Sequence, residues 1–127
     1  MVLVDTSVWI RFLANREPFA TDLSALLARD EVYGHDAVFG ELLIGDRGGR
    51  AKLLAGYQQM HQANVVAHKE VVSFVRARGL HGRGIGWIDA HLLASAVLDR
   101  LKLWTADAEL AKAADRLGSS HTPHDSD

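Results

Sequence analysis

Short apolar runs alternate with segments of helical periodicity, and this alternation constrains the fold more than any other feature of the sequence. The first run, Val2 to Val4, ends at Asp5 and is followed by apolar residues at helical spacing from Val8 to Leu13. Similar runs at Val32–Gly34 and Lys102–Thr105 also precede helical segments. Strands joined by helices pair in parallel. The sequence therefore predicts an α/β fold, with a short parallel sheet of about four strands flanked by about seven helices.

The same periodicity sets the expected bounds of the other elements. A further strand is expected near Val65-Val66, Gly45 is expected to end the third helix in a left-handed conformation, and Leu80 to Gly86 to form a mobile glycine-rich loop. Helices are expected over residues 8–13, 18–30, 36–44, 53–60, 71–78, 87–98 and 107–117.

Chain length and composition limit the classes of protein that need to be considered. The chain has 127 residues, enough for one domain with one core. We expect that domain over residues 1–118 and a polar, frayed tail over residues 119–127. The absence of cysteine excludes a disulfide framework, a thiolate nucleophile and a Cys-ligated zinc site. No apolar run approaches the roughly 20 residues that cross a bilayer, and no leader is recognised, so a cytoplasmic location without membrane contact is expected.

Charge is unevenly distributed along the chain. The segment from Arg47 to Arg83 contains seven basic residues and one acid, Glu70, which gives it a net charge of +6. Because the whole chain carries −2, the remainder carries −8. A basic region beside an acidic one is typical of a phosphate-binding surface next to a cation site. Solvated helix faces would give the same pattern.

Two acids follow predicted strands. Asp5 ends the first strand and Asp107 comes just after the strand at Lys102–Thr105. In a parallel sheet this position is the carboxyl edge, where α/β proteins bind ligands. Aspartate is also a favoured residue at helix N-termini, so helix capping explains either residue equally well when it is taken alone.

Two further acids lie within predicted helices. Glu41 is three or four residues from Ala37, Val38 and Ile44, which predicts that its carboxylate lies on an apolar face. Asp89 has a similar relation to Leu92, Leu93 and Ala96, although it is also close enough to its helix start to be a cap.

Acids gathered on buried faces repel one another unless a cation joins them. Several carboxylates without cysteine form the hard oxygen ligand set that suits Mg²⁺ or Mn²⁺. Mg²⁺ keeps water ligands and is readily completed by phosphate. The acids therefore indicate metal-assisted phosphodiester hydrolysis, which requires no side-chain nucleophile.

Four segments carry a family resemblance. Residues 5–10, 38–45, 87–96 and 103–107 resemble, in order and separation, the four acidic blocks of PIN-domain toxins of the VapC family. The resemblance implies a PIN-like three-layer α/β fold, a Mg²⁺ or Mn²⁺ site and endonucleolytic cleavage of RNA. It also implies a type II toxin–antitoxin pair with a VapB-type antitoxin, whose C-terminal segment crosses the active-site groove, and a homodimer. The implied metal ligands and catalytic residues are Asp5, Glu41, Asp89 and Asp107, with Thr6 supporting Asp5.

The sequence departs from the family pattern in two places. No apolar run follows the last helix, so the sheet is expected to lack the family's final short strand. After Asp107 only Glu109 offers a further acid within the turn.

Other residues admit alternative functions. His81 and His91 are candidates for histidine acid–base catalysis, but Asp89 and His91 are two residues apart and do not share a helix face. Trp9, Trp87 and Trp104 are interpreted as core or interface residues rather than base-stacking ones. Arg78 and Arg83 flank the glycine loop and are the expected RNA contacts. The competing functions are a PIN-like module that binds RNA or a partner without cutting it, and an Asp-based phosphotransfer domain.

Overall fold

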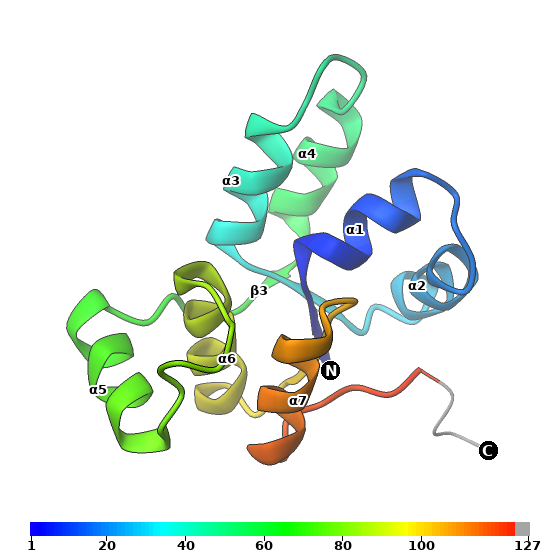
Figure 1. Ribbon diagram of the computed structural model, residues 1–127. Coiled ribbons are helices and arrows are strands. Elements are labelled where there is room, and N and C mark those ends of the chain that lie inside the picture. Colours follow the sequence, from blue (N-terminus) through cyan, green and yellow to red (C-terminus); the bar gives the residue numbers. More distant parts are fainter. Residues whose placement is uncertain (124–127) are drawn as a thin grey trace.

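The computed structural model, which describes residues 1–123, has a four-stranded parallel sheet at its centre (Figure 1). The strand order is β3-β2-β1-β4, and the pairs Val2↔Val32, Leu3↔Leu103 and Tyr33↔His61 set the register. All strands run the same way, as the alternating pattern predicts. The strands are β1 (Val2–Val4), β2 (Val32–Gly34), β3 (His61–Gln62) and β4 (Lys102–Trp104).

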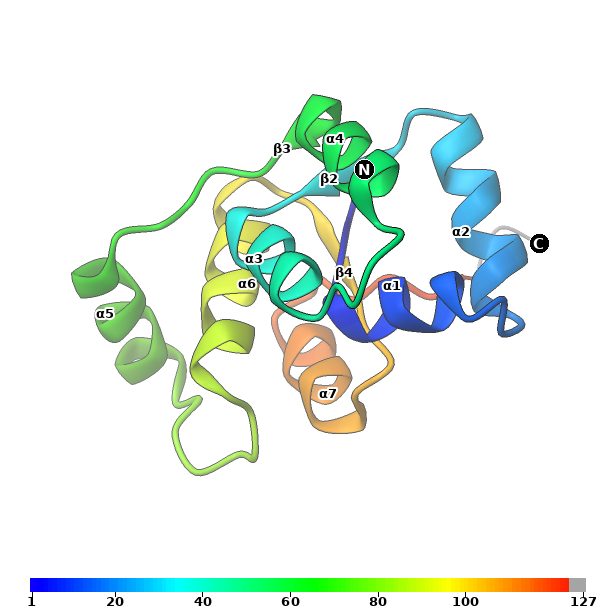
Figure 2. The same cartoon turned by 90° about the horizontal axis from the view of Figure 1, so that it is seen from above.

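Seven helices in the described residues surround this sheet, and Figure 2 shows α5 at one side of the molecule, outside α6. Helix α6 packs against β4 as well as against α5, and α1 packs against α2 and α3. None of these helices is long and apolar enough to cross a membrane. The helices are α1 (Thr6–Leu13), α2 (Phe19–Ala28), α3 (Asp36–Ile44), α4 (Ala51–Gln59), α5 (His68–Arg78), α6 (Trp87–Leu98) and α7 (Ala108–Arg116).

The hydrophobic core forms around β1, the inner strand between β2 and β4. Leu3 and Val4 are completely buried, and Trp9 on α1 and Leu92 on α6 pack in the same cluster. Burial of a side chain of this size contributes about 1.5–3 kcal/mol to folding. Because β1 is enclosed by other elements, its carboxyl end has a fixed position.

A buried polar network built around His35 joins β2 to α3, α4 and α6. The His35 amide donates to the Tyr57 hydroxyl at 2.8 Å, and the Ala37 amide donates to His35 Nδ1 at 3.0 Å. Since Nδ1 accepts a hydrogen bond, the ring proton is on Nε2, which donates to Ser95 Oγ at 3.0 Å. Burial lowers the pKa of the His35 imidazole, and the neutral ring is the form that fits this network.

Most expected elements are confirmed, and several details of the prediction are wrong; among them, α4 and α5 begin at Ala51 and His68, two and three residues earlier than expected. The third strand lies at His61–Gln62 instead of Val65-Val66, because Val66 packs with Val71 in a small cluster between α5 and α6. Gly45 ends α3 with φ −83°, so it is not a left-handed cap; Gly79, at the end of α5, has that conformation with φ 61°. Helix α2 ends at Ala28, two residues earlier than expected.

The expectation that no strand follows the last helix also needs correction. Ser120 forms a parallel bridge with Leu103, and the Leu103 amide donates to the Ser119 carbonyl at 2.6 Å. The His121 amide in turn donates to the Leu103 carbonyl at 3.0 Å. These are backbone bonds, which need no apolar side chains, so residues 119–121 lie against β4 instead of fraying. The rest of the predicted tail, residues 124–127, is outside the described residues.

The His35 network predicts a pH dependence of stability. A group whose pKa is lowered by folding contributes stability above its unfolded value of 6.5, and this contribution is lost as the pH falls below that value. His35→Asn keeps a helix-capping acceptor but removes the titrating ring and its bond to Ser95. We expect the variant to lose about 1–3 kcal/mol of unfolding free energy near pH 8.

The difference between parent and His35→Asn should shrink as the pH falls toward about 5.5, by at most about 1.4 kcal/mol per pH unit for one proton. Urea unfolding of both proteins at the two pH values measures it. The same difference at both values would show that His35 does not titrate with unfolding.

Candidate active site

Asp5 follows β1 at the carboxyl edge of the sheet and is held by two hydroxyl groups. Its carboxylate is 6% exposed, and Oδ2 accepts hydrogen bonds from Ser7 Oγ at 2.8 Å and Thr105 Oγ1 at 2.7 Å. Although Asp5 occupies the N-cap position of α1, its side chain makes no capping bond. The capping interpretation of Asp5 is therefore wrong, and its carboxylate instead joins the start of α1 to the segment after β4.

Ser7 and Thr105 were not singled out as site residues from the sequence, yet both organise this edge. Each hydroxyl has one proton, which it gives to Asp5, and each oxygen accepts a backbone amide, that of Ala106 for Ser7 and that of Asp107 for Thr105. A sequence signal that could have identified them is a hydroxyl residue two positions from an acid at a strand end, as in Asp5 with Ser7 and Thr105 with Asp107. The pattern fixes the Asp5 carboxylate and the backbone that leads to Asp107.

Glu41, in α3, reaches the same edge by another route. Thr6 Oγ1 donates to Glu41 Oε1 at 2.6 Å, which joins α1 to α3. The predicted apolar surroundings are wrong, because Glu41 is exposed and Ile44 on its face is 88% exposed. Thr6 was expected to support Asp5, whereas in the structure it holds Glu41.

Asp89 lies in the first turn of α6 and is half-buried. Its Oδ2 accepts the Gly86 amide at 3.1 Å, so it does contribute a capping interaction. Burial raises the pKa of the Asp89 carboxyl, and the negative charges of Asp5, Asp107 and Glu41 raise it further. The four predicted acids therefore lie within electrostatic reach of one another.

Two of the predicted ligands follow strands, and Asp107 is the exposed one of this pair. It caps α7 by accepting the amides of Glu109 at 2.9 Å and Leu110 at 3.0 Å. Capping is thus its observed role, and a role as metal ligand stays a prediction. The capping bonds use only Oδ1.

In the described part of the chain, none of the four acids forms an ion pair with a basic side chain. Within residues 1–123, the ion pairs are Arg29–Glu31, His61–Asp30 and Lys112–Glu109, and none includes a predicted ligand. Over the same residues no group of three or more His, Cys, Asp or Glu side chains is already arranged to hold a metal ion. The donor set nevertheless fits a hard divalent cation, since it consists of carboxylates whose mutual repulsion no lysine or arginine relieves.

The other singled-out residues lie around the glycine loop or in the core. Trp9 and Trp104 are buried, 1% and 3% exposed, as expected, whereas Trp87 is 43% exposed. The Arg78 guanidinium lies over the Phe74 ring at 5.6 Å, and Arg83 Nε donates to the Gly79 carbonyl at 2.7 Å. The structure leaves the RNA-contact prediction for Arg78 and Arg83 untested.

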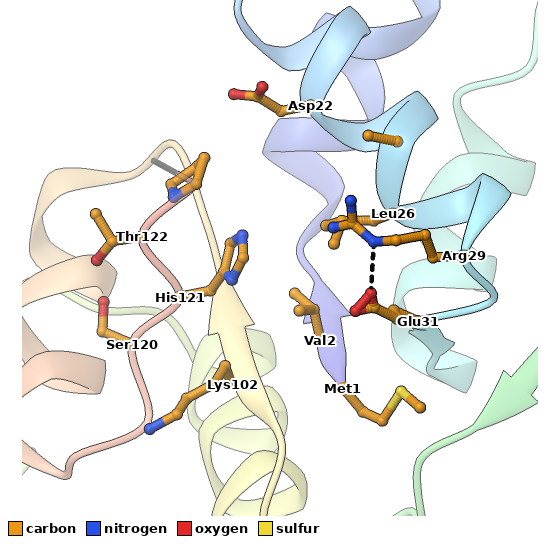
Figure 3. A pocket seen from close by; sticks show the side chains of 12 residues that line it. Met1, Val2, Asp22, Leu26, Arg29, Glu31, Lys102, Ser120, His121 and Thr122 are labelled. Atoms are coloured by element: carbon orange, nitrogen blue, oxygen red, sulfur yellow. Dashed lines mark hydrogen bonds and ion pairs between the residues drawn. The ribbon is translucent and has the colours of Figure 1, made fainter. Parts of the chain in front are cut away.

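A groove lies at the opposite end of the sheet from Asp5 and Asp107. This groove, of about 600 Å³, lies beside the starts of β1 and β4 and is lined by Val2, Lys102 and the Arg29–Glu31 ion pair of 2.7 Å (Figure 3). The acids follow the ends of these parallel strands, so groove and acids lie at opposite ends of the sheet. Cavity size therefore does not identify the candidate active site.

A small parallel sheet, with Asp5 and Asp107 after neighbouring strands and Asp89 within electrostatic range of both and of Glu41, is typical of a PIN-type domain. Comparison with known proteins supports this class. The PIN domain family model matches residues 2–116. Ribonuclease VapC32 of two Mycobacterium tuberculosis strains, CDC 1551 / Oshkosh and H37Rv, is 41% identical over 114 residues, 89% of this chain and 90% of that protein. The chain therefore belongs to the VapC branch of the PIN-domain family.

Two solved structures share the fold at low sequence identity. The crystal structure of FitAcB from Neisseria gonorrhoeae has a TM-score of 0.65 at 22% identity and covers 97% of this chain and 98% of its own. PAE2754 from Pyrobaculum aerophilum has a TM-score of 0.57 at 17% identity, covering 94% of this chain and 90% of its own. At this identity the likeness concerns the fold alone.

The hydroxyls around Asp5 give a testable prediction. Thr105→Val preserves shape but removes a donor to the buried Asp5 carboxylate and the acceptor for the Asp107 amide. We expect the unfolding free energy to fall by about 1–2 kcal/mol, because a hydrogen bond to a charged group is lost. Chemical denaturation in EDTA measures the effect. Thr105→Ser, which retains the hydroxyl, is the matched control, and an equal loss in both variants would contradict the assignment.

Proposed function

We propose that this chain is a metal-dependent endoribonuclease that acts as the toxin of a type II toxin–antitoxin pair. The observation that carries the proposal is that Asp89 lies within electrostatic range of Asp5, Glu41 and Asp107, which come from three other segments, and that none of the four is in an ion pair within residues 1–123. The 41% identical relative is a ribonuclease by name, which supports RNA as the substrate.

Asp5, Glu41, Asp89 and Asp107 would hold Mg²⁺ or Mn²⁺, with Thr6, Ser7 and Thr105 orienting the carboxylates. A bound ion of this type supplies Lewis-acid polarisation of a phosphate and a lowered pKa for an attacking water. The chain's own contribution is to fix Asp5 through two hydroxyls and to hold Glu41 through Thr6 of α1. These interactions restrict the positions of the Asp5 and Glu41 carboxylates individually.

The first functional prediction concerns the acids. Asp5→Asn and Asp89→Asn keep the shape but lose the charge that binds a hard cation. We expect each variant to cleave total RNA more than roughly 100-fold more slowly than the parent. Loss of a residue that only supports a metal ligand costs up to about 100-fold, and loss of a ligand itself should cost more. Asp115→Asn, on the exposed surface of α7, is the control and should cleave at the parent rate.

Stability should change in the opposite direction. Without metal, Asp89→Asn removes a carboxylate that is disfavoured by burial and by like charges, so its melting temperature should equal or exceed that of the parent. Added Mg²⁺ should raise the melting temperature of the parent more than that of the variant. RNA cleavage that persists in EDTA would overturn the metal mechanism and favour His81 or His91 as catalyst. Metal binding without cleavage by the parent would instead favour a binding module.

A basic cleft beside the acids is our candidate path for the RNA backbone. It has a volume of about 480 Å³, lies between the glycine loop and α7, and is lined by Arg83, Lys112 and Arg116 together with the acid Glu109. Lys112 and Arg116 were not anticipated from the sequence, because they lie outside the basic segment 47–83. Arg78, which is exposed over Phe74, is retained as a proposed contact at the loop's other end.

Removal of a phosphate contact should weaken RNA binding and lower its salt dependence. We expect Arg83→Ala and Lys112→Ala each to reduce the slope of log affinity against log salt by about 1, and Arg78→Ala to do the same if it touches phosphate. Binding of a single-stranded oligoribonucleotide in EDTA measures the slope. Arg29→Ala, at the opposite sheet edge, is the control; equal slopes in the Arg83, Lys112 and Arg29 variants would exclude this path.

The proposed partners are a second copy of the chain and a VapB-type antitoxin. Leu43 and Ile44 at the end of α3 are 52% and 88% exposed, and Ile10 on the contacting helix α1 is 48% exposed. Exposed apolar side chains on adjoining helices are typical of a protein interface. Ile44→Asp should weaken self-association or capture of the antitoxin by the purified chain. A monomer at micromolar concentration that retains no co-expressed small protein would contradict both partners.

A further inference from the structure

Trp87 begins α6 and is the only tryptophan of the chain that is not buried. The sequence contains three tryptophans, and with Trp9 and Trp104 in the core, the 43% exposure of Trp87 stands apart. An indole of this size normally contributes most when it is buried, so its exposure on a first helical turn costs hydrophobic stabilisation. Packing alone therefore does not account for its position.

Two histidines hold the indole in place. The His68 ring from α5 lies 5.2 Å from the Trp87 ring, tilted by 56°, and the His91 ring lies 5.0 Å away at 89°. These contacts limit the rotamers of Trp87 before any ligand binds, which lowers the entropy cost of using it as a binding surface.

Beside the indole is a small, largely apolar pocket. It has a volume of about 130 Å³ and is lined mainly by Val75, Leu80, Ile85, Ala90 and Trp87, with His81 at the glycine loop. Drug-sized ligands occupy pockets of about 300–1,000 Å³, so a cavity of this size takes a single ring system. The volume and the lining, which includes the Trp87 indole, suit one planar heterocycle.

The pocket adjoins the proposed RNA path. Gly82 lines both this pocket and the basic cleft that contains Arg83, and the same loop approaches α7 where Gly84 faces Glu109. Asp89 is two residues after Trp87 and is bonded to Gly86 of the pocket wall. A base in the pocket would therefore belong to a strand whose phosphates reach the cleft and the acids.

We infer that Trp87 and its pocket bind one unpaired base of the RNA substrate. This inference rests on the proposed ribonuclease function and assigns it a residue that positions the substrate. A base within a duplex is paired and stacked on its neighbours, whereas a base in a loop or single strand is free to leave the stack and lie against an aromatic side chain. Trp87 is in this sense a positioning residue for the substrate.

Fluorescence of the metal-free protein tests the inference without cleavage. A single-stranded decaribonucleotide of mixed sequence, titrated in EDTA, should quench the emission of exposed Trp87, and the same sequence as a duplex should not. Trp87→Phe should abolish the quenching yet retain much of the affinity. Trp87→Ala should weaken binding about 5- to 100-fold, the range that corresponds to loss of one base stack.

An oligonucleotide with an abasic position provides the matched ligand control. Removing the stacked base should weaken binding to the parent and have no effect on binding to Trp87→Ala. Far-UV circular dichroism and melting curves establish that both variants are folded. Unchanged affinity in Trp87→Ala, or equal binding of duplex and single strand, would overturn the inference. So would Trp87 emission that changes with protein concentration but not with RNA, which would mark the indole as a contact between two copies of the chain.

Kinetics separate this inference from the proposed function. If the parent cleaves RNA only with a divalent metal and Trp87→Ala does so with the same KM, the ribonuclease assignment stands and the base site is wrong. If Trp87 is quenched by single-stranded RNA but the parent does not cleave it, the base site stands and the catalytic assignment fails.

Discussion

The parallel pairing of β1 with β4 determines where chemistry can occur in this protein. Because both strands run in the same direction, the residues that follow them, Asp5 and Asp107, emerge at the same edge. The other two acids come from helices that begin near this edge or pack against α1. A change of register between β1 and β4 would separate Asp5 from Thr105 and thereby dismantle the hydroxyl pair that holds its carboxylate.

The carboxylates of the candidate site repel one another, and this repulsion lowers the stability of the fold. Asp89 is half-buried, burial raises its pKa, and the negative charges of the other three acids raise it further, while none of the ion pairs in residues 1–123 includes it. In the core, by contrast, the buried polar groups of His35, Tyr57 and Ser95 are joined by hydrogen bonds. The repulsion among the four acids is thus located where a bound cation or substrate can relieve it.

Much of the fold could be predicted from the sequence because hydrophobic periodicity reports burial, and helix α6 was delimited correctly from it. Asp5 and Asp107 were located by the rule for strand ends, and Glu41 by family resemblance, although the argument from its helix face was wrong. What could not be predicted depends on backbone or long-range contacts. The exposed strand β3 has two residues and no apolar signature. The bonds from Thr105 to Asp5 and from the Ala106 amide to Ser7 join segments about a hundred residues apart.

The contact of residues 119–121 with β4 closes one side of the sheet. The outer strand of a sheet has a row of unpaired backbone amides and carbonyls along its side, to which a strand of another molecule can bind. Proteins in which such outer strands are long and flat tend to aggregate. Here the Ser119 carbonyl and the His121 amide occupy the outer edge at Leu103, while the opposite edge, β3, is only two residues long. Residues 119–121 thus cover this edge of the sheet and hinder the addition of a strand from another molecule.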